Sequence, residues 1–219
     1  MKFIIILLFG IFLFSETCAA GTNNGVVLIA DGSLRFPCGG SSVYPWLIDP
    51  TSCEEADPAG EEWCWGLHWF HLFAASPIEN NTRIGGFYLG LGQYDQQRLY
   101  IDYFGAAVSG SLITPTSGWP GPGSGTIVDF RPYWISGEYE LLCYFGAYVY
   151  GEDDITIPLA NHPDHLSGVF DEDGEFDEFV GLPAMGFAGH PGSNPLCPGE
   201  EPTLNKVSTW GSIKSLYSI

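Results

Sequence analysis

The densest group of chemically active side chains is an acidic run, with six carboxylates within residues 171–178. Alternating carboxylates around a glycine bend are typical of loops that bind Ca²⁺. We therefore predict one calcium site with Gly174 at the bend, and with these ligands: Asp171, Asp173, Glu175 and Asp177. The match is partial, because no glutamate follows at the distance that an EF-hand loop requires. The alternative interpretation is a solvated acidic loop.

Four of the five histidines form two H-x-x-H pairs. His68 and His71 fall in a strand-like run, where positions i and i+3 face opposite sides, so they cannot share one metal ion. His162 and His165 lie in a loop and could converge. Because the motif offers no third ligand, it is a weak indication of zinc.

Paired carboxylates are the other arrangement that suggests catalysis. Glu138 and Glu140 share one face of a predicted strand, about 7 Å apart at the backbone, and such a pair could serve a secreted polysaccharide hydrolase. The nucleophile elbow G-x-S-x-G is absent around Ser124, because Pro122 stands two residues before it. No phosphate loop or dinucleotide fingerprint is present.

The cysteines are best interpreted in an oxidising compartment. Residues 1–20 have a basic start, a twelve-residue apolar run and small residues at the end, which predicts a signal peptide and removes Cys18. Five cysteines remain, so at least one is unpaired within the chain. We predict a Cys38–Cys53 disulfide across a Gly- and Pro-rich loop. Cys64 and Cys143 could pair across the core or remain buried thiols.

Three aromatic residues in predicted loops are the candidates for a ligand surface: Trp119, Tyr133 and Trp134. Residues 117–125 are rich in Gly and Pro and cannot form a strand or a helix. Trp119 within that loop either folds back onto the core or offers a platform to a ligand.

The elements that position these residues are predicted to be β-strands. Short β-branched and aromatic runs alternate with Gly, Pro, Asn and Asp, which indicates a single antiparallel β-sandwich, jelly-roll-like or Ig-like, with long Gly/Pro loops. No run before residue 200 has a convincing helical period. The predicted strands are 26–29, 63–73, 84–91, 98–104, 108–114, 126–130, 139–150, 155–159 and 176–182.

The composition changes after Cys197, so we expect a β-sandwich domain over 21–197 followed by a linker and tail over 198–219. An apolar stripe, with spacing i, i+3, i+6, i+7 from Trp210, predicts a short amphipathic helix that docks on a partner or on export machinery. A frayed terminus is the alternative.

Two short segments carry a resemblance. The tail TWGSIKSLY at 209–217 and the PGSNPLCP run at 191–198, with the Trp-Pro-Gly-Pro turn at 119–122, resemble uncharacterised secreted proteins of little-cultivated bacteria. The resemblance implies a bacterial export context and supplies no catalytic residue, because that family has no assigned activity. This chain departs from the pattern by ending in Ser218-Ile219 rather than in a basic residue.

The net charge of the chain limits the classes of partner that it can bind. A net charge of −19, with 7 Lys+Arg against 26 Asp+Glu, argues against nucleic acids and anionic membrane surfaces. No segment after the signal reaches eighteen apolar residues, so no membrane span is expected in the mature protein. We expect a secreted, non-catalytic extracellular or envelope module that binds a glycan or another surface component. The alternative is the hydrolase named above.

Overall fold

The structure is a computed structural model that describes residues 21–32, 50–60, 67–150, 155–187 and 189–200. The predicted signal peptide, the amphipathic tail, Cys38 and Cys64 lie outside these ranges. Within them, no helix has the length and apolarity to cross a membrane.

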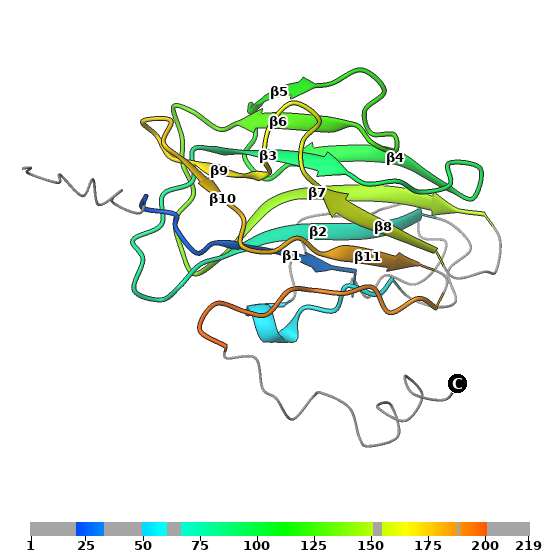
Figure 1. Ribbon diagram of the computed structural model, residues 1–219, viewed down its shortest axis with the longest axis horizontal. Helices are drawn as coiled ribbons and strands as arrows, with labels where there is room; N and C mark the ends of the chain where they lie inside the picture. Colours follow the sequence, from blue (N-terminus) through cyan, green and yellow to red (C-terminus); the bar gives the residue numbers. More distant parts are fainter. Residues whose placement is uncertain (1–20, 33–49, 61–66, 151–154, 188, 201–219) are drawn as a thin grey trace, which may run out of the picture.

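The described residues form two antiparallel sheets, which confirms the predicted all-β sandwich. In Figure 1, β5, β6 and β3 lie above β7, β2 and β1. The four-stranded sheet has the order β1-β2-β7-β4. Its strands are β1 (Val27–Asp31), β2 (Leu67–Ala75), β7 (Tyr139–Val149) and β4 (Leu99–Ala106).

The second sheet has the path β10-β9-β3-β6-β5, and β8 joins it by pairing with both β3 and β11. Its strands are β3 (Gly86–Leu91), β5 (Leu112–Pro115), β6 (Gly125–Asp129), β8 (Ile155–Ala160), β9 (Gly168–Phe170), β10 (Phe176–Glu178) and β11 (Ala184–Phe187).

The main core lies between the two sheets, because each strand turns its alternate apolar residues inward. Phe70 and Leu72 of β2 meet Phe87 and Leu89 of β3 in one fully buried cluster. A smaller cluster covers the opposite side of the four-stranded sheet, around Phe73. Both sides of β2 are therefore partly covered, as its continuous apolar run predicts.

Two β-bulges decide which side chains leave the core. In β7 the extra residue is Leu142, because Leu72 pairs with Cys143 while Phe73 pairs with Leu141. In β4 the extra residue is Asp102, since the pairing passes from Ile101 to Tyr103. Each bulge shifts the alternation by one residue, so the side chains beyond it change faces.

The strand boundaries differ from prediction at short elements. The predicted strand 108–114 begins only at Leu112, and the predicted strand 176–182 ends at Glu178. Beyond that end the chain follows the edge of β1, where Val180 donates a backbone hydrogen bond to Val26. Strands β9 and β11 were not predicted, because three or four residues are too few to display an alternating pattern.

The predicted Cys38–Cys53 disulfide is wrong, because Cys53 is bonded to Cys197. Cys53 lies in the short 3₁₀ helix η1 (Cys53–Glu55), which covers the outer side of β1 and β2 together with the segment that carries Cys197. Loop flexibility suggested a local pair, whereas the fold brings together residues 144 positions apart. Cys143 is a buried free thiol, so it does not pair with Cys64.

Candidate functional site

Aromatic side chains gather on the outer face of the four-stranded sheet, where β2, β7 and β4 run side by side. Trp69 of β2 lies across from Gly146 of β7, which in turn pairs with Tyr103 of β4. Residues that pair directly across an antiparallel ladder share a face. The Trp69 ring accordingly lies 5.6 Å from the ring of Tyr103 and 5.8 Å from that of Tyr144.

A further row continues this arrangement along the sheet. Tyr148 of β7 pairs with Tyr100 of β4, two residues from the row of Trp69 and Tyr103 on β7. Residues two apart in a strand lie on the same face. We call these five residues the aromatic face: Trp69, Tyr100, Tyr103, Tyr144 and Tyr148.

Two glycines allow the rings to lie against the sheet backbone. A Cβ at Gly105 would lie 2.2 Å from Cζ of Tyr144, so the tyrosine ring occupies the space that a side chain would need. A Cβ at Gly146 would lie 3.1 Å from Cβ of Tyr103. The rings therefore cover glycine backbone and form a low surface, as aromatic residues often do beside glycines in sheets.

The aromatic face is open to solvent on its β4 side. Tyr100 is 49% exposed and Tyr103 is 47% exposed, whereas Trp69, Tyr144 and Tyr148 are half-buried. The Nε1 donor of Trp69 is buried and has no hydrogen-bond partner. Asp102, the bulge residue, adds an exposed carboxylate beside the rings.

Beyond Tyr144 the aromatic side chains on this side of the sheet continue into a covered region. His71 lies between Tyr144 and Phe73, with ring centroids 6.3 Å from each. Phe73 stacks on Tyr139 at 4.4 Å, beside the cluster that holds the Cys53–Cys197 disulfide. Burial raises the pKa of Tyr139, with nearby carboxylates adding to the effect. The open part of the face is thus bounded on one side by a covered, rigid part.

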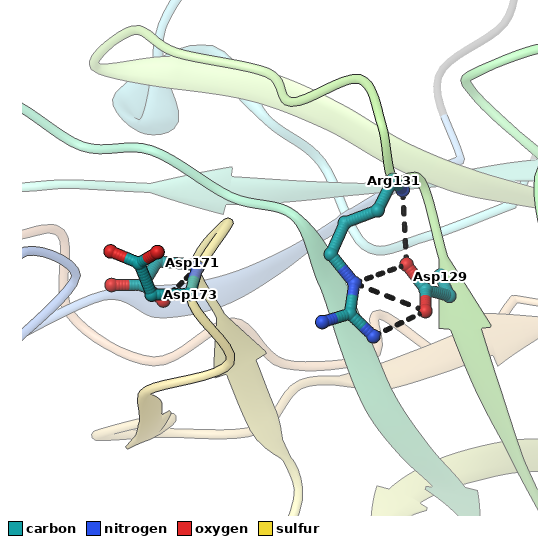
Figure 2. A network of polar contacts seen from close by, with 4 residues as sticks. All are labelled: Asp129, Arg131, Asp171 and Asp173. Atoms are coloured by element: carbon teal, nitrogen blue, oxygen red, sulfur yellow. Dashed lines mark hydrogen bonds and ion pairs between the residues drawn. The ribbon is translucent and has the colours of Figure 1, made fainter.

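Three of the residues predicted to bind calcium, Asp171, Asp173 and Glu175, lie in the turn between β9 and β10, and Asp177 lies in β10. Figure 2 shows Asp171 and Asp173 in this turn. Oδ1 of Asp171 accepts hydrogen bonds of 2.9 Å from the backbone N–H groups of both Asp173 and Glu175. Gly174 supplies the positive φ of 88° that closes the turn. Asp171 therefore stabilises the turn as a backbone acceptor.

Two further carboxylates of the acidic run have other protein partners. Oδ2 of Asp177 accepts a 3.1 Å hydrogen bond from the backbone of Asn23, and Glu172 forms an ion pair with Arg83. No group of three metal-binding side chains gathers among the residues that the structure describes. Calcium binding by this loop stays a prediction.

The loop aromatics proposed from the sequence are in two different environments. Trp119 packs onto the core, 5.1 Å from the ring of Phe104. Tyr133 is 63% exposed and Trp134 is 47% exposed, in the loop that follows β6. The guanidinium of Arg83 lies 4.7 Å from the Trp134 ring centroid, so one cation–π contact orients that ring.

The carboxylates and strand histidines singled out for catalysis or metal binding lie in different environments. Glu138 is exposed just before β7, and its backbone oxygen accepts a hydrogen bond from Ser76. Glu140 is half-buried beside Gly137, and burial raises the pKa of its carboxyl group. His68 faces the core side of β2, opposite Ala147, whereas His71 lies on the outer face.

Sequence reasoning did not select the aromatic face. The signal was present as alternation, since Trp69 and His71 recur on one face of a strand and Tyr144 and Tyr148 on one face of another. Three facts were hidden: the pairing of β2 with β7, the bulge at Asp102, and the exposure of Tyr100 and Tyr103 on β4. None of them follows from local sequence.

No protein-family model matches the chain, and no curated protein matches it. Its fold is similar to solved cohesin modules. The sixth cohesin of scaffoldin B from Acetivibrio cellulolyticus, solved with a dockerin, matches with a TM-score of 0.46 and 10% identity over 75% of this chain and 98% of that chain.

A type II cohesin domain from the cellulosome of the same organism matches with a TM-score of 0.45 and 11% identity, covering 61% of this chain and 91% of that chain. A cohesin from Clostridium acetobutylicum gives 0.43 and 15%, over 62% and 89%. At these values the similarities support no conclusion about function.

Proposed function

We propose that this chain is a secreted, non-catalytic module that binds an uncharged polysaccharide on the aromatic face. The observation that carries the proposal is that the side chains of Tyr144 and Tyr103 lie against Gly105 and Gly146. On the same face, Tyr100 and Tyr103 are about half exposed. A pyranose ring offers one apolar side to an aromatic ring, while its hydroxyls remain available for hydrogen bonds.

The rigidity of the aromatic rings supports a role in ligand binding. Rings that rest on sheet backbone and on each other lose little conformational freedom when a ligand arrives, so less binding energy is spent on ordering them. The phenolic hydroxyls of Tyr100 and Tyr103 can donate to and accept from sugar hydroxyls. An extended glycan chain could therefore contact several rings at once.

Charge selects among glycans. The chain has a net charge of −19, and Asp102 adds an exposed carboxylate next to Tyr103. A polyanionic glycan would meet repulsion at such a surface. A neutral polysaccharide avoids that cost.

The test is retention of the purified protein on insoluble neutral polysaccharides, with an acidic polysaccharide in parallel. The wild type and Tyr133→Ala should both be retained on a neutral polysaccharide, since Tyr133 is an exposed tyrosine away from the sheet. Tyr100→Ala and Tyr103→Ala should bind about tenfold more weakly each, or about 1.4 kcal/mol, which lies within the range for aromatic contacts.

A reducing-sugar assay on the same samples addresses the hydrolase alternative. Turnover by the wild type that is lost in Glu138→Gln and Glu140→Gln would replace the binding module by an enzyme that uses paired carboxylates. Retention that depends on Trp134 instead of Tyr103 would move the site to the loop after β6.

A further inference from the structure

A seven-residue excursion interrupts what would otherwise be one long strand beside β3. Ala160 at the end of β8 pairs with Gly90, and Gly168 at the start of β9 pairs with Tyr88. One residue would be enough to join these positions in a continuous strand. Residues 161–167 instead leave the sheet and fold over its outer side, and we call them the excursion loop.

Backbone and hydroxyl hydrogen bonds hold the base of the excursion loop. The backbone N–H of Ser167 donates to Oδ1 of Asn161 at 3.1 Å, and its hydroxyl donates to the carbonyl of Ala160 at 2.9 Å. The backbone of His165 donates to the carbonyl of His162 at 3.1 Å. These bonds define one tight conformation with His162 on its inner side.

His162 is buried in a neutral form. The residue is only 4% exposed. Its Nδ1 accepts a 3.2 Å hydrogen bond from the backbone N–H of Asp164. An accepting Nδ1 places the proton on Nε2, which is buried and has no partner. A Cβ at Gly125 of β6 would lie 2.6 Å from Cδ2 of His162, so the imidazole fits only over that glycine.

The groups facing this imidazole make a second proton costly. His165 lies 5.2 Å away in the same loop, and Tyr88 of β3 lies 6.3 Å away. The carboxylate of Asp164 favours the charged form, and from β6 Gly125 lies beside the imidazole ring. Burial lowers the pKa of His162, and the neighbouring His165 lowers it further.

Protonation would convert Nδ1 from an acceptor into a donor that faces the N–H of Asp164. The hydrogen bond would be lost, and a positive charge would be left beside His165. A metal ion on Nε2 is disfavoured by the same bond, because it would require the proton to move to Nδ1. The hydrogen bond to Nδ1 therefore makes the loop sensitive to protonation of His162 and disfavours a metal ion on Nε2.

We propose that the excursion loop is an acid-sensitive latch, which closes over Tyr88 while His162 is neutral and opens when His162 is protonated. Opening would uncover the ring of Tyr88, which now contacts His162, His165, Phe170 and Phe176. The latch acts on the second sheet, so it does not depend on the glycan proposal.

The test is nuclear magnetic resonance on the whole mature chain from about pH 7.5 to about pH 5, the range in which histidine titrates. The backbone amides of Asp164 and Ser167 should shift together with the ring protons of His162. Their hydrogen exchange, corrected for the intrinsic rate, should speed up by at most about tenfold per pH unit, the limit for one proton.

Two variants make the result specific. His162→Asn keeps an acceptor near the Asp164 N–H but cannot titrate, so the acid transition should disappear. His190→Asn is the matched control, because Nδ1 of His190 accepts a 3.0 Å bond from the backbone of Gly192 in a separate loop, and the transition should persist.

Amides of the excursion loop that stay fixed while the wild-type His162 ring titrates would overturn the proposal. So would an acid transition that persists in His162→Asn. If that variant fails to fold, the wild-type comparison of ring and amide titrations decides alone.

Discussion

At the scale of single residues, Gly105 and Gly146 allow the tyrosine rings of the aromatic face to lie close to the sheet backbone. Gly105 has no side chain, and the Tyr144 ring fills the space beside it. Gly90 also lacks room for a side chain, but there the obstacle is backbone, because a Cβ would lie 2.2 Å from the carbonyl oxygen of Asn161. The two positions therefore predict different consequences for the same substitution.

Gly105→Ala should weaken glycan retention more than it weakens the fold. The new methyl group meets the far end of a tyrosine side chain, which can swing away, so the ring rises from the sheet at little cost in stability. Gly90→Ala should reduce stability, by about 1–3 kcal/mol as for overpacked positions, because backbone must move. Thermal unfolding and polysaccharide retention measured on both variants check this, and equal losses of stability would contradict it.

Asp171 makes a second prediction at this scale. Asp171→Ala removes the acceptor for two backbone N–H groups and should cost about 1–3 kcal/mol in unfolding free energy. Asp173 is exposed, so Asp173→Ala should change stability by less than about 0.5 kcal/mol. Denaturant unfolding of both variants gives the comparison.

The calcium prediction is checked with the wild type and Asp173→Ala. If the acidic turn binds Ca²⁺, millimolar Ca²⁺ raises the wild-type unfolding midpoint above its value in chelator, and Asp173→Ala shows a smaller rise. An identical rise in both proteins, or none in the wild type, would contradict the predicted calcium site and leave the turn as a solvated acidic loop.

At the scale of elements, the bulge in β4 decides which way Tyr103 points. Ile101 faces the core, and if Asp102 were paired like an ordinary strand residue, the alternation would turn Tyr103 inward as well. The bulge instead sets Tyr103 on the outer face and Phe104 against Trp119 and Phe145. Because Asp102 stays unpaired, Tyr103 remains on the outer face as part of the candidate site.

Deletion of Asp102 should give regular pairing and keep the neighbouring side chains on their present faces, because Ile101 and Tyr103 already pair with the adjacent residues Ala147 and Gly146. Tyr103 stays outside and Phe104 stays in the core, so the loss of stability should be well below the several kcal/mol expected for overpacked or emptied core positions. Asp102→Ala keeps the bulge and should leave stability nearly unchanged. Unfolding of the two variants measures the difference, and a deletion variant that loses several kcal/mol relative to Asp102→Ala would contradict this pairing.

The positions of the strands along the chain could be predicted from the sequence better than the order of the strands in the sheets. The composition of long strands such as Tyr139–Val149 indicates a strand, and Gly and Pro residues indicate the turns between strands. The order β1-β2-β7-β4 depends on contacts between residues far apart in the chain. The aromatic face and the Cys53–Cys197 bond both depend on that order, which explains why local reasoning chose Trp134 and Cys38 instead.

At the scale of the whole molecule, one disulfide ties the end of the described domain to its beginning. Cys53 and Cys197 are 144 residues apart, and their sulfurs lie in the cluster that covers the outer side of Phe73. Closing a long loop restricts the unfolded chain. The bond also fixes the covered end of the aromatic row.

Replacing both cysteines, as Cys53→Ser with Cys197→Ser, should reduce the free energy of unfolding by about 2–5 kcal/mol. Cys143→Ser is the matched single-thiol control, and its cost should come from the core cavity and the buried hydroxyl rather than from a lost bond. Reductant should lower the midpoint of the wild type and of Cys143→Ser. Peptide mapping that places Cys53 with another cysteine would contradict the assignment.

The most direct test of the account is the affinity of the mature protein for a soluble neutral polysaccharide, measured by affinity electrophoresis or calorimetry for the wild type, Tyr103→Ala and Tyr133→Ala. The aromatic face predicts that Tyr103→Ala binds about tenfold more weakly than the wild type, while Tyr133→Ala binds equally well. Equal affinity of Tyr103→Ala and the wild type, or a loss confined to Tyr133→Ala, would contradict the account.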